Sequence, residues 1–262
     1  MLFRSLRGII LSAVQPDAMS HRSDLRGLVN LETQGRRLWH SLLGALYPPR
    51  CGGCGTIGSL WCETCQSGLL PVCAPMCAKC GEPNVPHRLC AKCREHPLQI
   101  DFVRSVVIFQ GALRQAVHRF KYQRLASLAD LFGDWLGDYW IENQLHADRI
   151  MPVPLHPARE RERGYNQSGL LAKRLSKRVG VPVAESGLQR IRATAVQMEL
   201  DAAQRRLNVA GAFVCVDPAV RQKRVVVIDD VCTTGATLEA CAAALLQARA
   251  ASVFGLTLAR TP

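Results

Sequence analysis

Two adjacent carboxylates and the threonine-rich turn behind them could do chemistry together. Asp229 and Asp230 follow the apolar run Val225–Ile228, which is typical of a buried parallel strand. Neighbouring carboxylates accept hydrogen bonds from paired hydroxyls, such as the 2′ and 3′ hydroxyls of a ribose, or hold a hydrated Mg²⁺. The sequence therefore predicts a diol or a cation at this strand end, the edge at which parallel sheets bind ligands.

The turn that follows is predicted to bind a phosphate. Its hydroxyls, its backbone N–H groups and the positive end of the helix that begins there all favour an anion. Its candidate residues are Thr233, Thr234, Gly235, Ala236 and Thr237. A phosphate beside a diol describes a ribose 5-phosphate, and a loop without lysine fits a P-loop NTPase poorly. The alternative is a polar turn that only caps a helix.

A second, basic segment could face the rest of such a ligand. The charged loop His156–Tyr165 follows a short strand, Arg149–Leu155, and guanidinium groups match phosphate oxygens. Its candidates for binding a pyrophosphate are His156, Arg159, Arg161, Arg163, Gly164 and Asn166. The alternative is a solvated loop in which Glu160 and Glu162 partly neutralise the arginines. No residue can be assigned as a catalytic acid or base.

Most of the 12 cysteines are clustered before residue 94, in a pattern typical of zinc sites. They form four Cys-x-x-Cys pairs: Cys51/Cys54, Cys62/Cys65, Cys77/Cys80 and Cys90/Cys93. Two Cys₄ sites would bind two structural Zn²⁺, although one zinc with interleaved pairs stays open, as does the pairing. A disulfide framework is the alternative, but it needs an oxidising compartment. Cys73 is expected to be free.

The remaining pattern predicts an α/β protein. Apolar periodicity indicates strands and helices in alternation, and the polar stretch at residues 188–215 is interpreted as a mobile flap over the site. The predicted elements are a strand at 101–109, a helix at 111–122, a helix ending at Val179 and capped by Asn166 or Ser168, a short helix near 202–207, and strands at 212–216 and 252–259.

Composition limits the class of protein and its partners. The 262-residue chain carries a formal net charge of +12, which predicts attraction to nucleotides or to nucleic acid. No stretch of about 20 apolar residues predicts a transmembrane segment. Because the N-terminus makes an incomplete signal peptide, the protein is expected to be cytoplasmic. Residues 1–40 are expected to be a poorly ordered extension, and Met19 is a possible alternative start.

The segment RVVVIDDVCTTGAT resembles the phosphoribosyl-pyrophosphate motif of the type I phosphoribosyltransferases, which are glycosyltransferases that transfer a pentosyl group. The resemblance implies a parallel sheet flanked by helices. It also implies that Asp229 and Asp230 bind the ribose hydroxyls, that residues 233–237 bind the 5′-phosphate, and that Mg²⁺ accompanies the ligand.

The order of the segments is similar to that of the ComF family of competence and GntX-like proteins. The resemblance covers roughly residues 45–262 and rests on YPPRCGGCG, the later cysteine pairs, FKY, PVPLHPARERERGYNQ and the final loop. It implies a double zinc ribbon at 45–97, a phosphoribosyltransferase-like domain at 100–262 and a role in DNA uptake, with an unknown acceptor. The alternative is a non-catalytic uptake factor that binds single-stranded DNA. The residues QRLASL after Lys121-Tyr122 depart from the expected turn.

Overall fold

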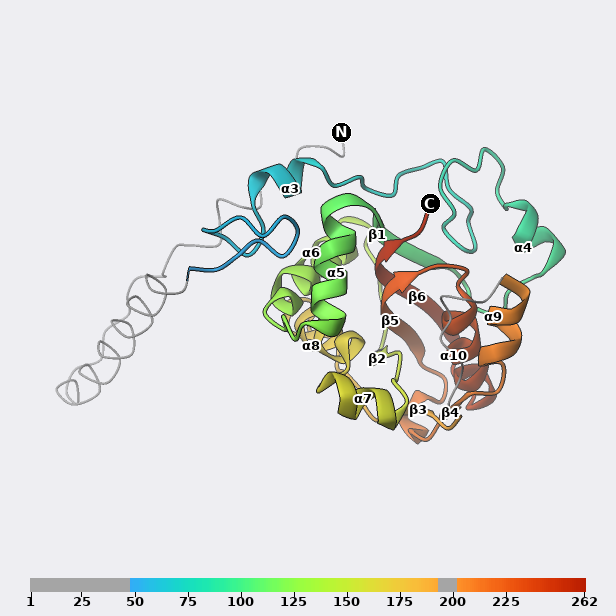
Figure 1. The fold of residues 1–262 in the computed structure, drawn as a ribbon. Helices are drawn as coiled ribbons and strands as arrows, with labels where there is room; N and C mark the ends of the chain where they lie inside the picture. Colours follow the sequence, from blue (N-terminus) through green and yellow to red (C-terminus); the bar gives the residue numbers. More distant parts are fainter. Residues whose placement is uncertain (1–47, 193–201) are drawn as a thin grey trace, which may run out of the picture. The chain divides into compact units, whose positions relative to one another are not determined.

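A four-stranded parallel sheet carries the described part of the chain. The computed structural model describes residues 48–192 and 202–262 (Figure 1). The strands β1 (Val103–Ile108), β2 (Arg149–Pro152), β5 (Arg224–Cys232) and β6 (Ser252–Arg260) lie in the order β1-β6-β5-β2. Every neighbouring pair is parallel. A separate antiparallel pair, β3 (Leu188–Arg190) with β4 (Phe213–Cys215), lies between β2 and β5 in the sequence.

Helices cover both faces of the sheet, as α/β architecture requires. Val226 and Ile228 of β5 belong to one apolar cluster, whereas Val225 and Val227 belong to the other. The first cluster is covered by α5 (Gly111–Tyr122), α6 (Leu128–Glu142) and α8 (Gln167–Val179), and the second by α10 (Ala236–Gln247) and α9 (Ala202–Val209). Figure 1 shows these two groups of helices on opposite sides of the strands. The prediction of a parallel sheet flanked by helices is confirmed.

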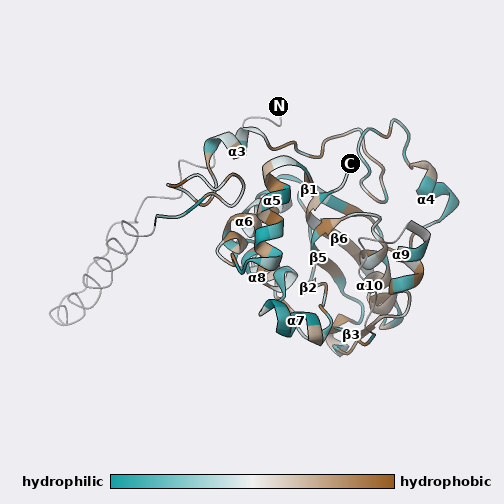
Figure 2. Cartoon of the chain, viewed as in Figure 1, coloured by the Kyte–Doolittle hydropathy of each residue, from teal (hydrophilic) through white to brown (hydrophobic). Residues whose placement is uncertain are grey.

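The prediction of a charged loop at 156–165 is wrong in one respect, because most of this segment is helical. Helix α7 spans Pro157–Arg163, and the helix begins at Pro157 because the fixed φ of proline suits a first turn. The side chain of His156 accepts a hydrogen bond from Ala158 N at 3.3 Å, and Gly164 ends the helix with φ +85°. No residue of α7 is buried, and the helix is strongly hydrophilic in Figure 2.

Other elements lie close to their expected positions. Asn166 caps α8 by accepting a hydrogen bond from Ser168 N, and Gly180 ends that helix. The strand predicted to run to Leu155 ends at Pro152, since two prolines in this stretch lack ladder donors. A short 3₁₀ turn, η3 (Pro218–Val220), precedes β5. The expected N-terminal extension and the centre of the predicted flap lie outside the described residues.

Two cysteine-rich segments precede β1 and pack within the same unit, Pro49–Pro262. Each holds one short helix, α3 (Glu63–Ser67) or α4 (Ala91–Glu95), that begins directly after a cysteine. Backbone hydrogen bonds join the second segment to the first strand, from Val103 N to Lys79 O at 2.7 Å and from Val72 N to Val106 O at 3.0 Å. Among the described residues, no helix is long and apolar enough to cross a membrane.

Candidate functional site

A cavity of about 410 Å³ opens at the carboxyl end of β5. It brings together two groups of residues that the sequence placed far apart. From the end of β5 and the turn after it come Asp229, Asp230, Thr233, Gly235, Ala236 and Thr237, and from the basic segment come Arg159 and Arg163. The two acids, which the sequence placed in a turn after the strand, lie within β5. The carboxylates, the phosphate-type turn and two arginines therefore share one cavity.

The two carboxylates are held in different ways. Asp229 Oδ1 accepts hydrogen bonds from Ser168 Oγ at 2.8 Å and from Asp230 N at 2.9 Å. Asp230 Oδ2 lies 2.8 Å from Lys121 Nζ, and the Asp230 side chain is only 3% exposed. Asp230 Oδ1 also accepts a hydrogen bond from Val231 N at 2.7 Å. Asp230 is thus neutralised by an ion pair, whereas Asp229 relies on neutral donors.

This difference changes the acidity of the pair. Burial, and then the neighbouring charge of Asp230, raise the pKa of Asp229 to about 7. Burial alone would lower the pKa of Lys121, but the charge of Asp230, its hydrogen bond and the charge of Asp229 together outweigh burial, and the net pKa is raised. Lys121 therefore stays cationic at neutral pH, and Asp229 is close to its midpoint. A diol or a cation that prefers charged Asp229 would compete with its proton.

The threonine turn has the geometry of an anion-binding helix start. Helix α10 begins at Ala236, and its N-cap residue Gly235 has φ +78°. A side chain at that φ would be strained. Glycine also has no side chain with which to cap the first-turn N–H groups, and such groups bind phosphates in other proteins. The turn lies at the end of β5, so an anion bound there would sit beside the two carboxylates.

A basic wall completes the cavity. Besides Arg159 and Arg163, it contains Arg114, His118, Lys121 and Arg190. Burial, followed by the positive charge of Arg159, lowers the pKa of Arg190, which is the expected effect of crowding cations that face one space. The Arg163 guanidinium lies 5.2 Å from the centre of the Tyr122 ring. A polyanion such as a pyrophosphate would relieve this repulsion.

Five predicted residues do not line this cavity. They are His156, Arg161, Gly164, Asn166 and Thr234. Asn166 joins two elements instead, because its side-chain amide donates to Val153 O at 3.1 Å while its Oδ1 caps α8. Thr234 lines a neighbouring cavity. In the RGYNQS segment, Arg163 and Gln167 line the cavity, whereas Asn166 and Tyr165 connect elements around it: the Tyr165 hydroxyl donates to Phe120 O, next to Lys121.

Sequence reasoning missed several residues of the site. Lys121, Ser168, Arg114, His118 and Arg190 were not among its candidates. Lys121 carries the strongest missed role, since it pairs with Asp230. One available signal was that Arg114, His118 and Lys121 recur at helical spacing on a helix that follows a parallel strand, which places them on one face at the ligand-binding edge.

The cysteine pairs form two separate candidate metal centres. The first contains Cys51, Cys54, Cys62 and Cys65, and the second contains Cys77, Cys80, Cys90 and Cys93; within each cluster all four sulfurs lie within 4.8 Å of one another. The prediction of two Cys₄ sites is confirmed, and neighbouring pairs share a site. Cys73 is free and exposed, as predicted.

The sulfur geometry fits zinc. The Sγ–Sγ distances are 3.6 Å for Cys51–Cys65, 3.6 Å for Cys54–Cys62 and 3.7 Å for Cys80–Cys90. A tetrahedron with Zn–S bonds of about 2.3 Å has an edge of about 3.8 Å, whereas a disulfide needs about 2 Å. Burial raises the pKa of Cys77, but backbone N–H donors outweigh it and lower the pKa to about 6, whereas burial raises the pKa of Cys80 and Cys93 in the same cluster.

Arginines of the α/β domain donate hydrogen bonds to backbone carbonyls of both metal centres. Arg119 Nη1 donates to Cys51 O at 2.9 Å, and Arg260 Nη1 donates to Cys80 O at 2.7 Å. Arg119 lies on α5, two residues before Lys121. Arg260 ends β6, where Thr261 N donates to Cys232 O at 3.0 Å, directly before the threonine turn. Each centre is therefore connected to one side of the phosphate-type cavity.

The fold and the two cysteine clusters define a protein in which a double zinc ribbon is joined to a phosphoribosyltransferase domain. A family model for the double zinc ribbon domain matches residues 42–94, and one for the phosphoribosyl transferase domain matches residues 166–262. These matches agree with the Cys₄ sites and with the cavity on β5.

Curated relatives match most of the chain. The chain is 34% identical to DNA utilization protein YhgH of Escherichia coli O157:H7, over 71% of this chain and 84% of that protein. It is 29% identical to competence protein ComFC of Bacillus subtilis (76% and 84%) and 32% identical to competence protein F of Haemophilus influenzae (68% and 80%). The chain belongs to the ComF family, the family of these DNA utilization and competence proteins.

Proposed function

We propose that the cavity on β5 binds phosphoribosyl pyrophosphate. Asp229 and Asp230 accept hydrogen bonds from the ribose hydroxyls, and residues 233–237 bind the 5′-phosphate at the start of α10. Arg114, Arg159, Arg163 and Arg190 face the pyrophosphate. The observation that carries the proposal is that one cavity holds a carboxylate pair, a helix N-terminus and a basic wall, and these match the diol, the phosphate and the pyrophosphate of a single ligand.

Mg²⁺ is proposed to accompany this ligand. The donor set fits a hard cation, because two adjacent carboxylates offer oxygen ligands and only one of them, Asp230, is ion-paired with Lys121. Asp229 and Asp230 would hold the metal directly or through its waters, and when bound it would neutralise the pyrophosphate.

A phosphoribosyl transfer to an unidentified acceptor is the activity proposed for the site. The chain's own contribution is to orient the sugar by its diol, to hold the leaving pyrophosphate with arginines, and to exclude water. The proposed setting is DNA uptake in the cytoplasm, supported by the competence and DNA utilization names of the relatives. Two clusters of unpaired thiols also fit a reducing compartment.

Calorimetry with phosphoribosyl pyrophosphate and Mg²⁺ tests the binding step. The parent protein is expected to bind one ligand, and Asp229→Asn/Asp230→Asn is expected to lose at least about tenfold in affinity, since both diol acceptors are weakened. Asp101→Asn is the matched control, because this exposed carboxylate lies outside the cavity. Equal affinities for the parent and the double variant would refute the proposed binding mode. Pyrophosphate release with a panel of bases and amines then tests turnover.

A non-catalytic protein that binds single-stranded DNA is the second candidate. It is favoured by the net charge of +12 and by α7, an exposed helix with Arg161 at its surface. Affinity for an oligothymidylate should then fall steeply with salt, and Arg161→Gln should reduce the salt dependence. Absence of binding at low salt would remove this candidate and leave the first untouched.

A further inference from the structure

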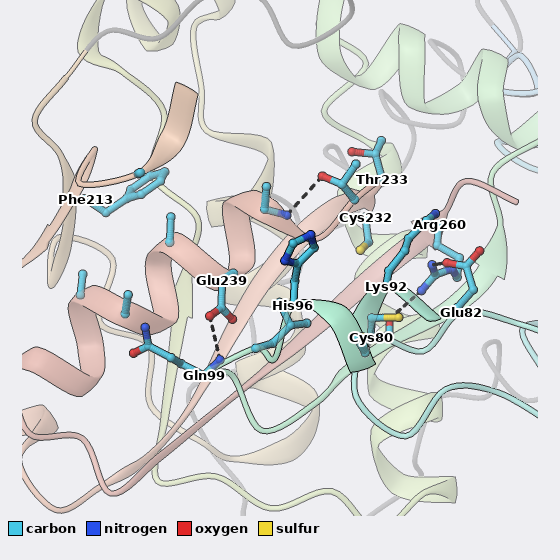
Figure 3. Close-up of a pocket in the computed structure, with 18 of the residues that line it drawn as sticks. Cys80, Glu82, Lys92, His96, Gln99, Phe213, Cys232, Thr233, Glu239 and Arg260 are labelled. Carbon is cyan, nitrogen blue, oxygen red and sulfur yellow. Dashed lines mark hydrogen bonds and ion pairs between the residues drawn. The ribbon is translucent and has the colours of Figure 1, made fainter. Parts of the chain in front are cut away.

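A second cavity, also of about 410 Å³, lies between α10 and the second cysteine-rich segment (Figure 3). Its floor is one face of α10. The residues on this face are Ala236, Glu239, Ala240, Ala243, Ala244 and Gln247, which recur at helical spacing. Four of these six side chains are methyl groups, so most of the floor is apolar and low, with the Glu239 carboxylate at its side. Such a surface fits the face of a planar ring better than it fits a branched or globular ligand.

Aromatic and polar groups surround this floor. Phe213 and Arg260 lie at opposite ends of the residues drawn in Figure 3, and His96 lies between them. Thr233 and Thr234 of the phosphate-type turn also line the cavity. The ring of a ligand could therefore contact aromatic side chains, while hydroxyls and an imidazole are available to heteroatoms at its edge.

The charges of the walls are compensated within the protein. The Glu239 carboxylate accepts hydrogen bonds from Gln99 N at 2.7 Å and from Ile100 N at 3.1 Å. Glu82 pairs with Arg260 at 2.5 Å. Lys92 adjoins Cys93, whose cluster would be anionic as four thiolates around one zinc. Because Glu239, Glu82 and Arg260 already have partners in the protein and Lys92 is exposed to solvent, the cavity favours an uncharged ligand over an anion or a cation.

We propose that this cavity binds an uncharged, planar heteroaromatic ring. The ring lies on the alanine face of α10 with one end toward Phe213, and its polar edge faces His96 and Thr233. The cavity volume is within the range of small-molecule sites, about 300–1,000 Å³. The site is separate from the proposed phosphoribosyl-pyrophosphate site, although Cys232, Thr233 and Ala236 line both cavities.

Calorimetry with 9-methyladenine tests the proposal. This uncharged planar compound has no ribose or phosphate, so it does not mimic the ligand of the first cavity, and its blocked N9 removes the attachment position at which purines carry ribose. Saturable binding of one molecule per chain is expected, with cyclohexanecarboxamide as a neutral, non-planar control that binds at least about tenfold more weakly. Equal binding of the two compounds, or no saturation at millimolar 9-methyladenine, would overturn the proposal.

Variants locate the compound in the cavity. Ala243→Leu fills the floor and is expected to weaken binding of 9-methyladenine at least about tenfold. Ala251→Leu is the matched control, since Ala251 is exposed and outside the cavity, and it should bind like the parent. Unchanged binding to Ala243→Leu, or an equal loss in Ala251→Leu, would place the compound elsewhere and reject this site.

Discussion

At the scale of single residues, the site depends on how two adjacent acids are neutralised. Asp230 is paired with Lys121, and Asp229 is hydrogen-bonded to Ser168. Of the two carboxylates, Asp230 is therefore ion-paired, whereas the pKa of Asp229 is raised to about 7. The residue that creates this difference, Lys121, is not adjacent to the acids in sequence.

Substituting Lys121 tests this arrangement. Lys121→Met is expected to lower the free energy of unfolding by about 2–4 kcal/mol, because it leaves Asp230 buried without a counter-ion. Urea denaturation measures this loss. Lys121→Arg should restore most of the stability, whereas Lys177→Met, at an exposed lysine outside both cavities, should leave it unchanged. A stable Lys121→Met protein would show that the ion pair contributes little.

The raised pKa of Asp229 predicts a pH dependence of ligand binding. Since charged Asp229 is the better acceptor for hydroxyls and the better ligand for Mg²⁺, affinity should rise as pH increases through about 7. Ser168→Ala removes a hydrogen bond that lowers this pKa, so the midpoint should move to higher pH. Calorimetry across pH 6–8 measures it. In Asp229→Asn, the affinity should depend on pH only through the titration of the ligand itself. If the affinity of this variant varied with pH as that of the parent does, Asp229 would not be the titrating group.

The stability of the unliganded protein should have the opposite pH dependence. The folded-state pKa of Asp229, about 7, is above its ordinary value of 3.8. The favourable contribution of the neutral acid is therefore complete below about pH 4 and is lost as pH rises through 7. Denaturant titrations at pH 5 and pH 8 measure this loss. The free energy of unfolding should fall more between these pH values in the parent than in Asp229→Asn, and equal changes in the two proteins would exclude the titration of Asp229 as the cause.

At the scale of elements, a helix cap and a glycine turn position the elements around the site. Asn166 caps α8 and also binds Val153 O at the end of β2, so one side chain sets the distance between the helix that carries Ser168 and the sheet. Gly81 has φ +73°, and a Cβ there would lie 2.6 Å from Val103 O, so the second ribbon can approach β1 only with glycine at this position.

Removing the α8 cap should be costly. Asn166→Ala is expected to destabilise the protein by about 1 kcal/mol through loss of the N-cap, with a further loss from the bond to Val153 O. The control is Asn143→Ala, because Asn143 follows the C-terminus of α6, is exposed and bonds only locally to Tyr139 O. Thermal unfolding compares the two variants, and equal effects would show that capping of α8 has no special importance.

The metal centres should also support the ligand site. Cys80→Ser is expected to lower the zinc content from about two ions per chain to about one. It should also weaken binding of phosphoribosyl pyrophosphate, because Cys80 O anchors Arg260 beside the phosphate-type turn. Cys73→Ser is the matched control, since this thiol belongs to neither cluster. Metal analysis and calorimetry measure both effects, and unchanged ligand affinity after zinc loss would refute the connection.

At the scale of the whole molecule, the two cavities share a wall. Cys232, Thr233 and Ala236 line both, so occupation of one cavity should alter the affinity of the other. Such coupling is reciprocal: the factor by which 9-methyladenine changes the affinity for phosphoribosyl pyrophosphate must equal the factor in the reverse direction. Calorimetry of each ligand in the presence of the other measures both factors. Full independence would show that the shared turn is rigid.

Much of the chemistry could be predicted from short segments. The Cys-x-x-Cys pairs, the IDDVCTTGAT turn and the caps of α8 each depend on residues that are neighbours along the chain, and local geometry follows from local sequence. For that reason both Cys₄ sites and the start of α10 were predicted nearly correctly, whereas the strand predicted at Val225–Ile228 continues through both acids to Cys232. The helix α7 was missed because its alternating charges hide a proline start and a glycine end.

The sequence alone determined which chemical groups this protein carries: paired acids, an anion-binding turn and eight metal-binding thiols. Only the tertiary structure decided which groups meet. The contact of Ser168 with Asp229 spans 61 residues, that of Arg260 with Cys80 spans 180, and Lys121 reaches Asp230 from another helix. These long-range contacts depend on how helices pack across the sheet, and no local spacing of residues encodes that packing. The second cavity arises in the same way, where α10 faces a ribbon far from it in the chain.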